Sequence, residues 1–151
     1  MRYVLFLTII GTGLTLTGPA YAGDREDILS LQDSIIAAWN SGNIDNVQQY
    51  YTDEFTAFHP NGELLTAWNW NSLKEWSKTA SISINKPQHR QVRIYGNTAL
   101  LTYYTKMTIN HSDGSSEIQT RRSTTMMVKQ SGQWKMEHYH ASLLTPTNSG
   151  E

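Results

Sequence analysis

Apolar side chains recur at intervals of three and four over residues 24–41, the spacing of one face of a helix. That face carries Ile28, Leu31, Ile35, Ala38 and Trp39. Gly42 follows at once, as expected where a helix ends in left-handed backbone. The sequence therefore predicts a long amphipathic helix here, and shorter helices over about 44–51 and 69–78.

The pattern changes after residue 81. Four segments are rich in Thr, Val, Ile, Tyr and Met: residues 88–95, 98–110, 117–129 and 133–144. The turn signals Gly96-Asn97, Asp113-Gly114 and Ser131-Gly132 separate them, which predicts consecutive antiparallel strands. A shorter strand is predicted over residues 55–59. Helices followed by a meander predict an α+β domain in which the helices cover the hydrophobic face of the sheet.

Alternation along the strands predicts which side chains face the inside, because neighbours in a strand point to opposite faces. In the last strand the more apolar set is Trp134, Met136, His138, His140 and Ser142, which places both histidines inward. In the strand before it, the more apolar set contains Arg122 and leaves Arg121 toward solvent. Met127 falls in the opposite set, and a bulge would reverse the assignment.

The first 22 residues have the features of a secretory signal peptide. Arg2 precedes an apolar run over residues 3–16, and Pro19 precedes the small-residue site Ala20-Tyr21-Ala22. The run is shorter than the roughly 20 residues that a membrane-spanning helix needs. We therefore predict a mature protein that begins near Gly23 and is periplasmic or secreted, with one domain over residues 23–144 and a flexible tail over 145–151.

Composition excludes several function classes. The mature part carries 11 basic and 13 acidic side chains, so its formal charge of −2 favours neither a nucleic acid nor an anionic membrane as partner. Cysteine is absent, so the domain must rest on its core rather than on disulfides. No nucleophile motif, phosphate loop or dinucleotide signature is visible, and no cofactor is expected.

Two pairs of residues are candidates for chemistry. His138 and His140 have a spacing that suits either a metal or hydrogen-bonded packing, and with no third ligand evidently converging, no metal site is predicted. Lys106 and Arg122, if inward, need a partner because a buried unpaired cation costs several kcal/mol. Inward carboxylates are scarce on the strands, which favours an anionic ligand; the alternative is that both side chains reach the rim.

Several short motifs fall in an order that resembles a known family. They are Trp39-Asn40-x-Gly42, Thr56-Ala57-Phe58-x-Pro60, Gly96 and Ala99 leading to Tyr104, Gly132-x-Trp134, His138-x-His140-x-Ser142 and Thr145-Pro146. The chain resembles the SnoaL-like domains of the nuclear-transport-factor-2-like superfamily, and is similar to the association domain of calcium/calmodulin-dependent kinase II. The resemblance implies a curved antiparallel sheet wrapped around a long N-terminal helix, with a cavity between them.

The resemblance also carries expectations about the site. The kinase hub pocket is lined with arginines; one of them matches Lys106, while the positions of two others match Ser72 and Thr125, which lack the charge. Many SnoaL-like sequences have an arginine that matches Arg122. Enzymes of the family use a carboxylate or histidine base with a polarising Tyr or Asp, for which this chain offers His138, His140 and Tyr104.

Three hypotheses about function follow. The first is an exported cavity protein that binds a small polar or anionic organic molecule through Tyr104, Lys106, Arg122, His138 and His140. The second is an acid/base enzyme, an isomerase, dehydratase or hydrolase, with His138, His140 and Tyr104 as catalytic candidates. The third is a non-catalytic oligomerisation module. A homodimer is also expected, because Met127, Tyr139 and Leu143 are predicted to leave apolar area on the outer sheet face.

Overall fold

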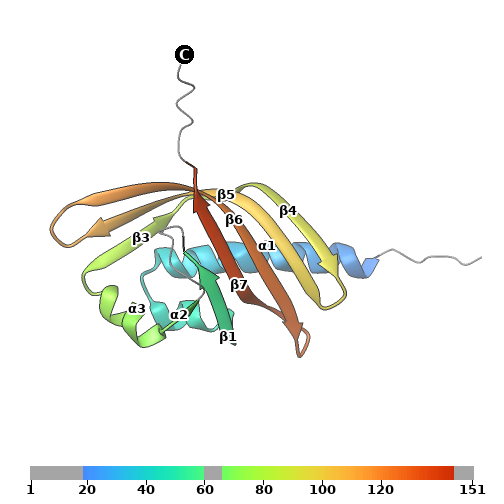
Figure 1. The fold of residues 1–151 in the computed structure, drawn as a ribbon. Helices are drawn as coiled ribbons and strands as arrows, with labels where there is room; N and C mark the ends of the chain where they lie inside the picture. Colours follow the sequence, from blue (N-terminus) through green and yellow to red (C-terminus); the bar gives the residue numbers. More distant parts are fainter. Residues whose placement is uncertain (1–18, 60–65, 145–151) are drawn as a thin grey trace, which may run out of the picture.

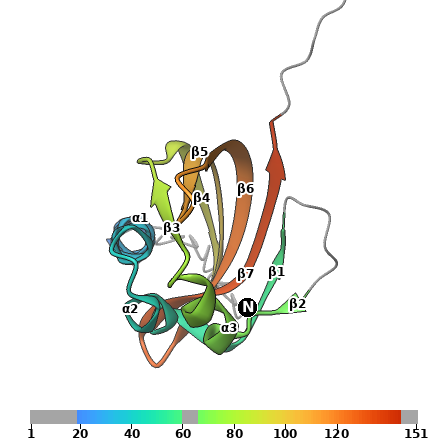
Figure 2. The same ribbon diagram turned by 90° about the vertical axis from the view of Figure 1, so that its left-hand side faces the viewer.

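The protein folds as a curled sheet wrapped around one long helix (Figures 1 and 2). The computed structural model describes residues 19–59 and 66–144, and the side chains of 23–59 and 68–144. Helix α1 spans Pro19–Asn40, followed by the short helix α2, Ile44–Gln48, and later by α3, Trp70–Trp76. Most of the predicted signal peptide and the predicted tail, residues 145–151, lie outside the described residues.

Within the described residues, seven strands form one mixed sheet in the order β2-β1-β7-β6-β5-β3, with β4 also paired to β5. Their bounds are β1 Tyr51–Phe58, β2 Thr66–Ala67, β3 Ala80–Ile84, β4 Gln88–Tyr95, β5 Thr98–His111, β6 Ser116–Gln130 and β7 Gln133–Leu143. The long strands β5, β6 and β7 are antiparallel neighbours, as predicted. The α+β class and the curved sheet around the first helix are confirmed.

Two pairings go beyond what local pattern predicts. Strand β1 joins β7 in parallel, so the sheet is not wholly antiparallel. Strand β3 pairs with the far half of β5, while β4 pairs with its near half. Strand β5 is therefore long enough to take two partners in succession, and Figure 2 shows the sheet that contains it curling around α1.

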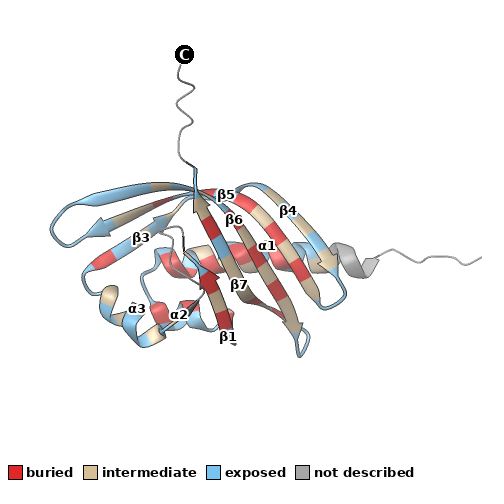
Figure 3. Ribbon diagram, in the orientation of Figure 1, coloured by how far each residue is buried: buried red, intermediate tan, exposed pale blue. Residues whose placement is uncertain are grey.

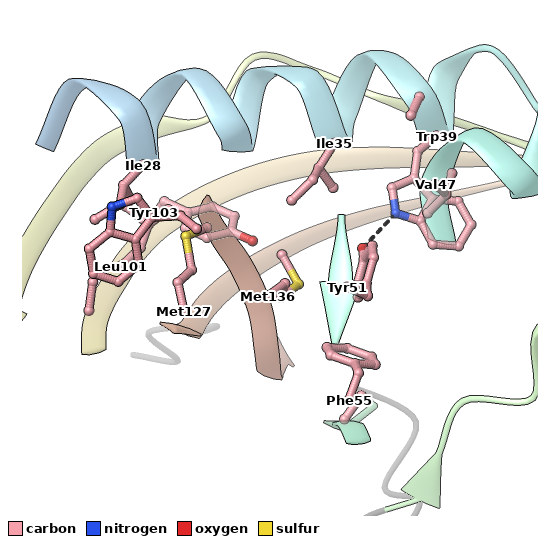
Figure 4. Packing of buried hydrophobic residues seen from close by; sticks show 14 of the residues in the cluster. Ile28, Ile35, Trp39, Val47, Tyr51, Phe55, Leu101, Tyr103, Met127 and Met136 are labelled. Atoms are coloured by element: carbon pink, nitrogen blue, oxygen red, sulfur yellow. Dashed lines mark hydrogen bonds between the residues drawn. The ribbon is translucent and has the colours of Figure 1, made fainter. Parts of the chain in front are cut away.

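The core lies between α1 and the concave face of the sheet. Ile28, Leu101 and Met127 are fully buried, and Figure 4 shows them packed beneath the first part of the helix. Figure 3 shows buried residues alternating with more exposed ones along β5, β6 and β7, the pattern of strands with one covered face. Burying each such side chain contributes about 1.5–3 kcal/mol relative to leaving it in water.

An aromatic cluster packs around the other end of α1. Trp39 Nε1 donates a hydrogen bond of 3.0 Å to the Tyr51 hydroxyl, and both side chains are buried (Figure 4). Burial raises the pKa of Tyr51 far above its usual value, although the Trp39 hydrogen bond acts in the opposite direction. The phenol is therefore neutral at any physiological pH, and it serves as a fixed hydrogen-bond partner.

A bulge in β7 reverses the predicted facing of its second half. Met127 of β6 pairs with Met136 but Met126 pairs with His138, so Glu137 is an extra residue. Trp134 and Met136 therefore face the core as predicted, whereas His138 and His140 face outward. The prediction that both histidines point inward is wrong, because the bulge changes the alternation between Met136 and His138.

The facing predicted for β6 is also wrong. Ser123, Thr125 and Met127 are buried, so the odd-numbered set faces the inside. Arg121 consequently points inward and Arg122 outward, as the position of Met127 in the pattern had warned. The longer apolar run of the even-numbered set was misleading, because its Ile118 is 60% exposed near the end of the hairpin.

Candidate functional site

A cavity of about 780 Å³ lies between α1, α3 and the concave face of the sheet. Helix α1 contributes Gln32, Ile35, Ile36 and Trp39, while α3 contributes Ser72, Leu73 and Trp76. Strands β3, β5, β6 and β7 complete the wall with the side chains that their alternation turns inward. The arrangement follows from the curl of the sheet, which Figure 2 shows from the end of α1. Its volume is in the range of about 300–1,000 Å³ that is typical of small-molecule sites.

One part of the cavity wall is aromatic. The rings of Trp39 and Trp68 meet edge to face at 5.4 Å, and Trp68 stacks on Tyr51 at 5.7 Å. Trp68 Nε1 also donates a hydrogen bond of 2.9 Å to Nε2 of His59, which lines the cavity as well. Such rings present flat apolar surfaces with few rotatable bonds, and they suit a planar or apolar ligand body.

Another part of the wall is ionic and comes from one strand. Glu117, Gln119 and Arg121 alternate along β6 and all line the cavity. Nε2 of Gln119 donates a hydrogen bond of 2.6 Å to Oε1 of Glu117. Oε1 of Gln119 in turn accepts from Nε of Arg121 at 2.7 Å and also from its Nη2. Among the described residues no carboxylate forms an ion pair with Arg121. The guanidinium is thus held by an amide oxygen, while its charge stays uncompensated by direct pairing.

A third group of polar side chains lies under α1. The hydroxyls of Tyr103 and Thr125 are 3.3 Å apart, and those of Tyr139 and Ser123 are 3.2 Å apart. Burial raises the pKa of Tyr103, with a smaller contribution from Tyr139, while hydrogen bonds such as that from Thr125 oppose the shift. Tyr103 therefore stays protonated, and it is a hydrogen-bonding group rather than a base.

Gln32 on α1 reaches the same part of the cavity with only 2% of its surface exposed. Its Oε1 accepts a long hydrogen bond of 3.5 Å from Arg90, whose guanidinium pairs at 2.8 Å with Asp33. Its amide lies close enough to Tyr103 to lower the pKa of that phenol slightly, but Nε2 has no hydrogen-bond partner of normal geometry in the described chain. A buried donor without a partner is costly, which makes it a marker for a bound group.

The residues predicted from sequence to bind a ligand lie on the other face of the sheet. Tyr104, Arg122 and His140 line a separate open groove of about 360 Å³ on the convex side. Lys106 is exposed on the same side of β5 and does not line the groove. The interpretation that these side chains face the cavity is wrong, since β5 and β6 turn their odd-numbered residues toward α1.

His138 also lies on this outer side, beyond the groove lining. Its Nδ1 is 2.9 Å from the Thr56 hydroxyl, and its ring meets the edge of Phe58 at 5.8 Å. Partial burial lowers the pKa of His138, the nearby His140 lowers it further, and Glu137 opposes both. The two histidines therefore do not converge on one cavity, and none of the described residues form a group of three metal-ligating side chains.

Sequence reasoning missed the residues that give the cavity its polar character: Gln32, Gln119, Arg121 and Tyr139. Their signal was present in β6, where Glu117, Gln119 and Arg121 share the parity of the apolar Met127. It was outweighed there by the apolar run of the other set. For Gln32, its position as a polar residue on the buried side of a helix could have indicated a role in the cavity.

The family model for the SnoaL-like domain matches residues 28–146. This chain belongs to the SnoaL-like domain family. The match covers all of the cavity-lining side chains, so the resemblance inferred from the motifs is confirmed. No protein of curated function matches the chain. No helix within the described ranges is both long and apolar enough to cross a bilayer.

Solved structures show the same fold at low sequence identity. A protein of the nuclear-transport-factor-2-like family from Streptomyces avermitilis is 18% identical, with a TM-score of 0.71 over 83% of this chain and 99% of that one. A superfamily member from Salmonella enterica is 20% identical, with a TM-score of 0.69 over 87% and 99%. The calcium/calmodulin-dependent kinase II hub homology domain of Chlamydomonas reinhardtii is 18% identical, with a TM-score of 0.65 over 81% and 99%.

Proposed function

We propose that this SnoaL-like protein binds a small organic molecule in the cavity, and that the molecule has an apolar, aromatic-sized body and an anionic group that pairs with Arg121. The observation that carries the proposal is the position of Arg121, a cation on the wall of a largely apolar cavity, which forms no ion pair with a described carboxylate. The proposal keeps the anionic ligand predicted from the sequence, but assigns its binding to Arg121 instead of Arg122.

Electrostatics supports the assignment. A cation in a partly desolvated site is favourable only beside a compensating charge or water, and Gln119 supplies a dipole rather than a charge. Glu117 lies on the same wall but uses an oxygen to accept from Gln119, so the amide separates the two charges. A ligand carboxylate can pair with the planar guanidinium through two parallel hydrogen bonds, the geometry for which arginine is suited.

Gln32 supports a second polar contact. Its unpartnered Nε2 lies in a buried side chain on α1, whereas Arg121 lies on β6 across the cavity. A ligand with a hydrogen-bond acceptor at the end opposite to its anionic group would satisfy both. The aromatic side chains of the wall would pack against the body of the molecule, so that shape and two polar ends together determine selectivity.

The test compares 2-naphthoate with its neutral analogue 2-naphthamide, followed by the tryptophan fluorescence of the folded protein. Trp39, Trp68 and Trp76 line the cavity and report occupancy. The wild type should bind the carboxylate more tightly than the amide. The variant Arg121→Gln should lose about 1.5–3 kcal/mol of naphthoate binding, roughly a 10- to 150-fold weakening, and little of naphthamide binding.

The matched control is Arg122→Gln, which removes the same charge one residue away on the opposite face. It should leave naphthoate binding unchanged. Equal affinity of the wild type for the two compounds, or failure to bind either, would contradict the proposal. A similar loss in both variants would mean that the net charge of the protein, rather than Arg121, governs binding.

The enzyme alternative requires different residues from those first considered. His138, His140 and Tyr104 face away from the cavity, and so cannot act on a molecule inside it. Among the described residues that line the cavity, His59 and Glu117 carry the side-chain types that commonly serve as general acids or bases. Binding is the function that the position of Arg121 on the cavity wall supports directly.

Export and self-association belong to the same proposal. Export is supported by the signal features of residues 1–22. Self-association is supported by the likeness to association-type domains such as the Chlamydomonas hub homology domain. The earlier reason for a homodimer is wrong, since Met127 is fully buried and Tyr139 and Leu143 line the cavity. The homodimer stays a prediction, and light scattering would measure it.

A further inference from the structure

The outer groove on the convex face of the sheet has features of a binding site in its own right. Strands β4, β5, β6 and β7 each contribute side chains to its volume of about 360 Å³. His89, Tyr104, Arg122 and His140 lie among its lining residues, with Thr124 and Ser142 beside them. No carboxylate occurs among the described residues that line it. Its chemistry is therefore cationic and hydrogen-bonding, in contrast to the aromatic cavity on the other side.

Arg122 is oriented within the groove by a side-chain hydrogen bond. Its Nε donates a hydrogen bond of 2.7 Å to Oγ of Ser142 on the neighbouring strand. No described carboxylate forms an ion pair with Arg122. Because Nε is occupied, the two terminal nitrogens remain available to bind an anion. A guanidinium that is oriented in advance loses less side-chain entropy when it binds.

Two irregularities of the sheet bring histidines to the same groove. The bulge after Met136 turns His140 to the outer face. In β4 the register shifts between Gln88 and Gln91. His89 lies between them with a φ of +53°, a left-handed backbone conformation that residues other than glycine rarely adopt. The His89 ring meets the Tyr104 ring edge to face at 6.0 Å. Backbone strain and bulges of this kind concentrate at sites where a side chain must be aimed.

We propose that this groove is a second ligand site, distinct from the cavity, which binds a small oxyanion such as a phosphate group. Arg122 would bind two oxygens, and His89, His140 and the Tyr104 hydroxyl would donate to the others. The ligand is either free phosphate or the phosphate of a small ester, which the volume of the groove also accommodates. The proposal is independent of the cavity ligand, because Arg121 and Arg122 lie on opposite faces of β6.

The charged side chains of the groove favour an anion. Arg122 is the only permanently charged side chain among the described residues that line it. Lys106 and His138 are further basic side chains on this outer face, beyond the lining. Glu137, the extra residue of the bulge, also lies outside the lining, so no carboxylate of the described lining competes with the ligand for Arg122.

The experiment titrates the folded, signal-free protein with inorganic phosphate and with glycerol 3-phosphate, followed by chemical shifts of histidine rings and backbone amides. Signals of His89 and His140 should move with saturation. Arg122→Gln should weaken binding about tenfold. The compound that binds more tightly identifies the ligand as a free anion or an ester.

Arg121→Gln is the matched control and should keep wild-type phosphate binding, the reverse of its effect on naphthoate. Ser142→Ala, which frees Nε of Arg122, provides a milder variant should Arg122→Gln fold poorly, and it should weaken binding by a smaller factor. Three results would overturn the proposal: no saturable shift with either compound, equal weakening in the two arginine variants, or a dimer that covers these histidines and leaves their signals unchanged by phosphate.

Discussion

Neighbouring residues can have unrelated roles in a strand, and Arg121 and Arg122 illustrate this. The same side chain faces an aromatic cavity at one position and an open groove at the next. Each is oriented by a hydrogen bond to an uncharged partner, Gln119 or Ser142, rather than by a carboxylate. Substitution at either position removes one positive charge from the same strand, so each variant controls for the effect of net charge in the other.

Asp24 is another residue whose role depends on a distant partner. It accepts hydrogen bonds from Lys129 and, at 3.2 Å, from Trp134 Nε1, and so ties the start of α1 to the β6–β7 hairpin. The Lys129 hydrogen bond, followed by that of Trp134, lowers the pKa of Asp24 below its ordinary value of 3.8. A lowered carboxyl pKa adds stability above the ordinary value, and this contribution disappears as pH falls through the lowered value.

We therefore expect Asp24→Asn to lower the melting temperature at pH 7. The difference from the wild type should shrink at an acidic pH below the lowered pKa of Asp24, where the wild-type carboxylate is protonated too. Thermal denaturation followed by circular dichroism at both pH values measures this. As a control, Asp27→Asn, near the same helix start and without an ion pair in the described structure, should change the melting temperature less. An equal deficit for Asp24→Asn at both pH values would exclude the charge as its cause.

At the scale of elements, irregularities of the strands decide which face each side chain takes. The bulge at Glu137 reverses the alternation of β7, and the shift in β4 aims His89. Strand β6 itself is regular in its pairing with β5, and its facing is set by the burial of Met127 against α1. The inward set of β6 can therefore be tested with two adjacent methionines.

Met127→Ala should destabilise the fold by about 2–5 kcal/mol, the range for truncating a fully buried side chain. Met126→Ala, on the outer face and only partly buried, should cost clearly less. Urea denaturation of the two variants and the wild type gives both values. Equal losses, or a larger loss at Met126, would contradict the assignment of Arg121 to the cavity side, because Arg121 and Met127 point to the same face of β6.

At the scale of the whole molecule, Asp24 connects α1 to the β6–β7 hairpin close to the predicted cleavage site. Asp24 makes its contacts with Lys129 and Trp134 just after the predicted cleavage site at Ala22. Removing residues 1–22 would thus keep every interaction of the domain described above. The mature protein would retain α1 from its first anchored turn onward.

We expect mass spectrometry of the protein expressed in a bacterial host to find an amino terminus near Gly23 in the periplasmic fraction or the medium. Replacing Ala20 and Ala22 by bulky residues should block processing, because the signal peptidase site requires small side chains. An intact Met1 on protein recovered from the cytoplasm would contradict the predicted localisation.

Much of this architecture was determined by sequence patterns that act locally. The three-and-four spacing around Ile28 and Ile35 predicts α1, and turn residues such as Gly96 and Gly132 delimit the long strands closely. Both of these signals arise from neighbouring residues: a helix repeats within four positions, and a tight hairpin turn depends on left-handed backbone at one or two residues. The motifs around Trp39 and Gly132 also indicated the family that residues 28–146 match.

Only the tertiary structure decided the facing of the site residues. A bulge is one extra residue whose position depends on the partner strand, so the facing of His138 and His140 could not be derived from β7 alone. The parity of β6 is likewise decided by the contact between Met127 and the helix, which outweighs the apolar run that includes Ile118. The sequence by itself determined the long first helix and the four long strands, and its motifs indicated the family and the curved sheet. The short strands β2 and β3, the parallel pairing of β1 with β7 and the choice of which arginine faces the cavity were decided by the packing of strand on strand and sheet on helix.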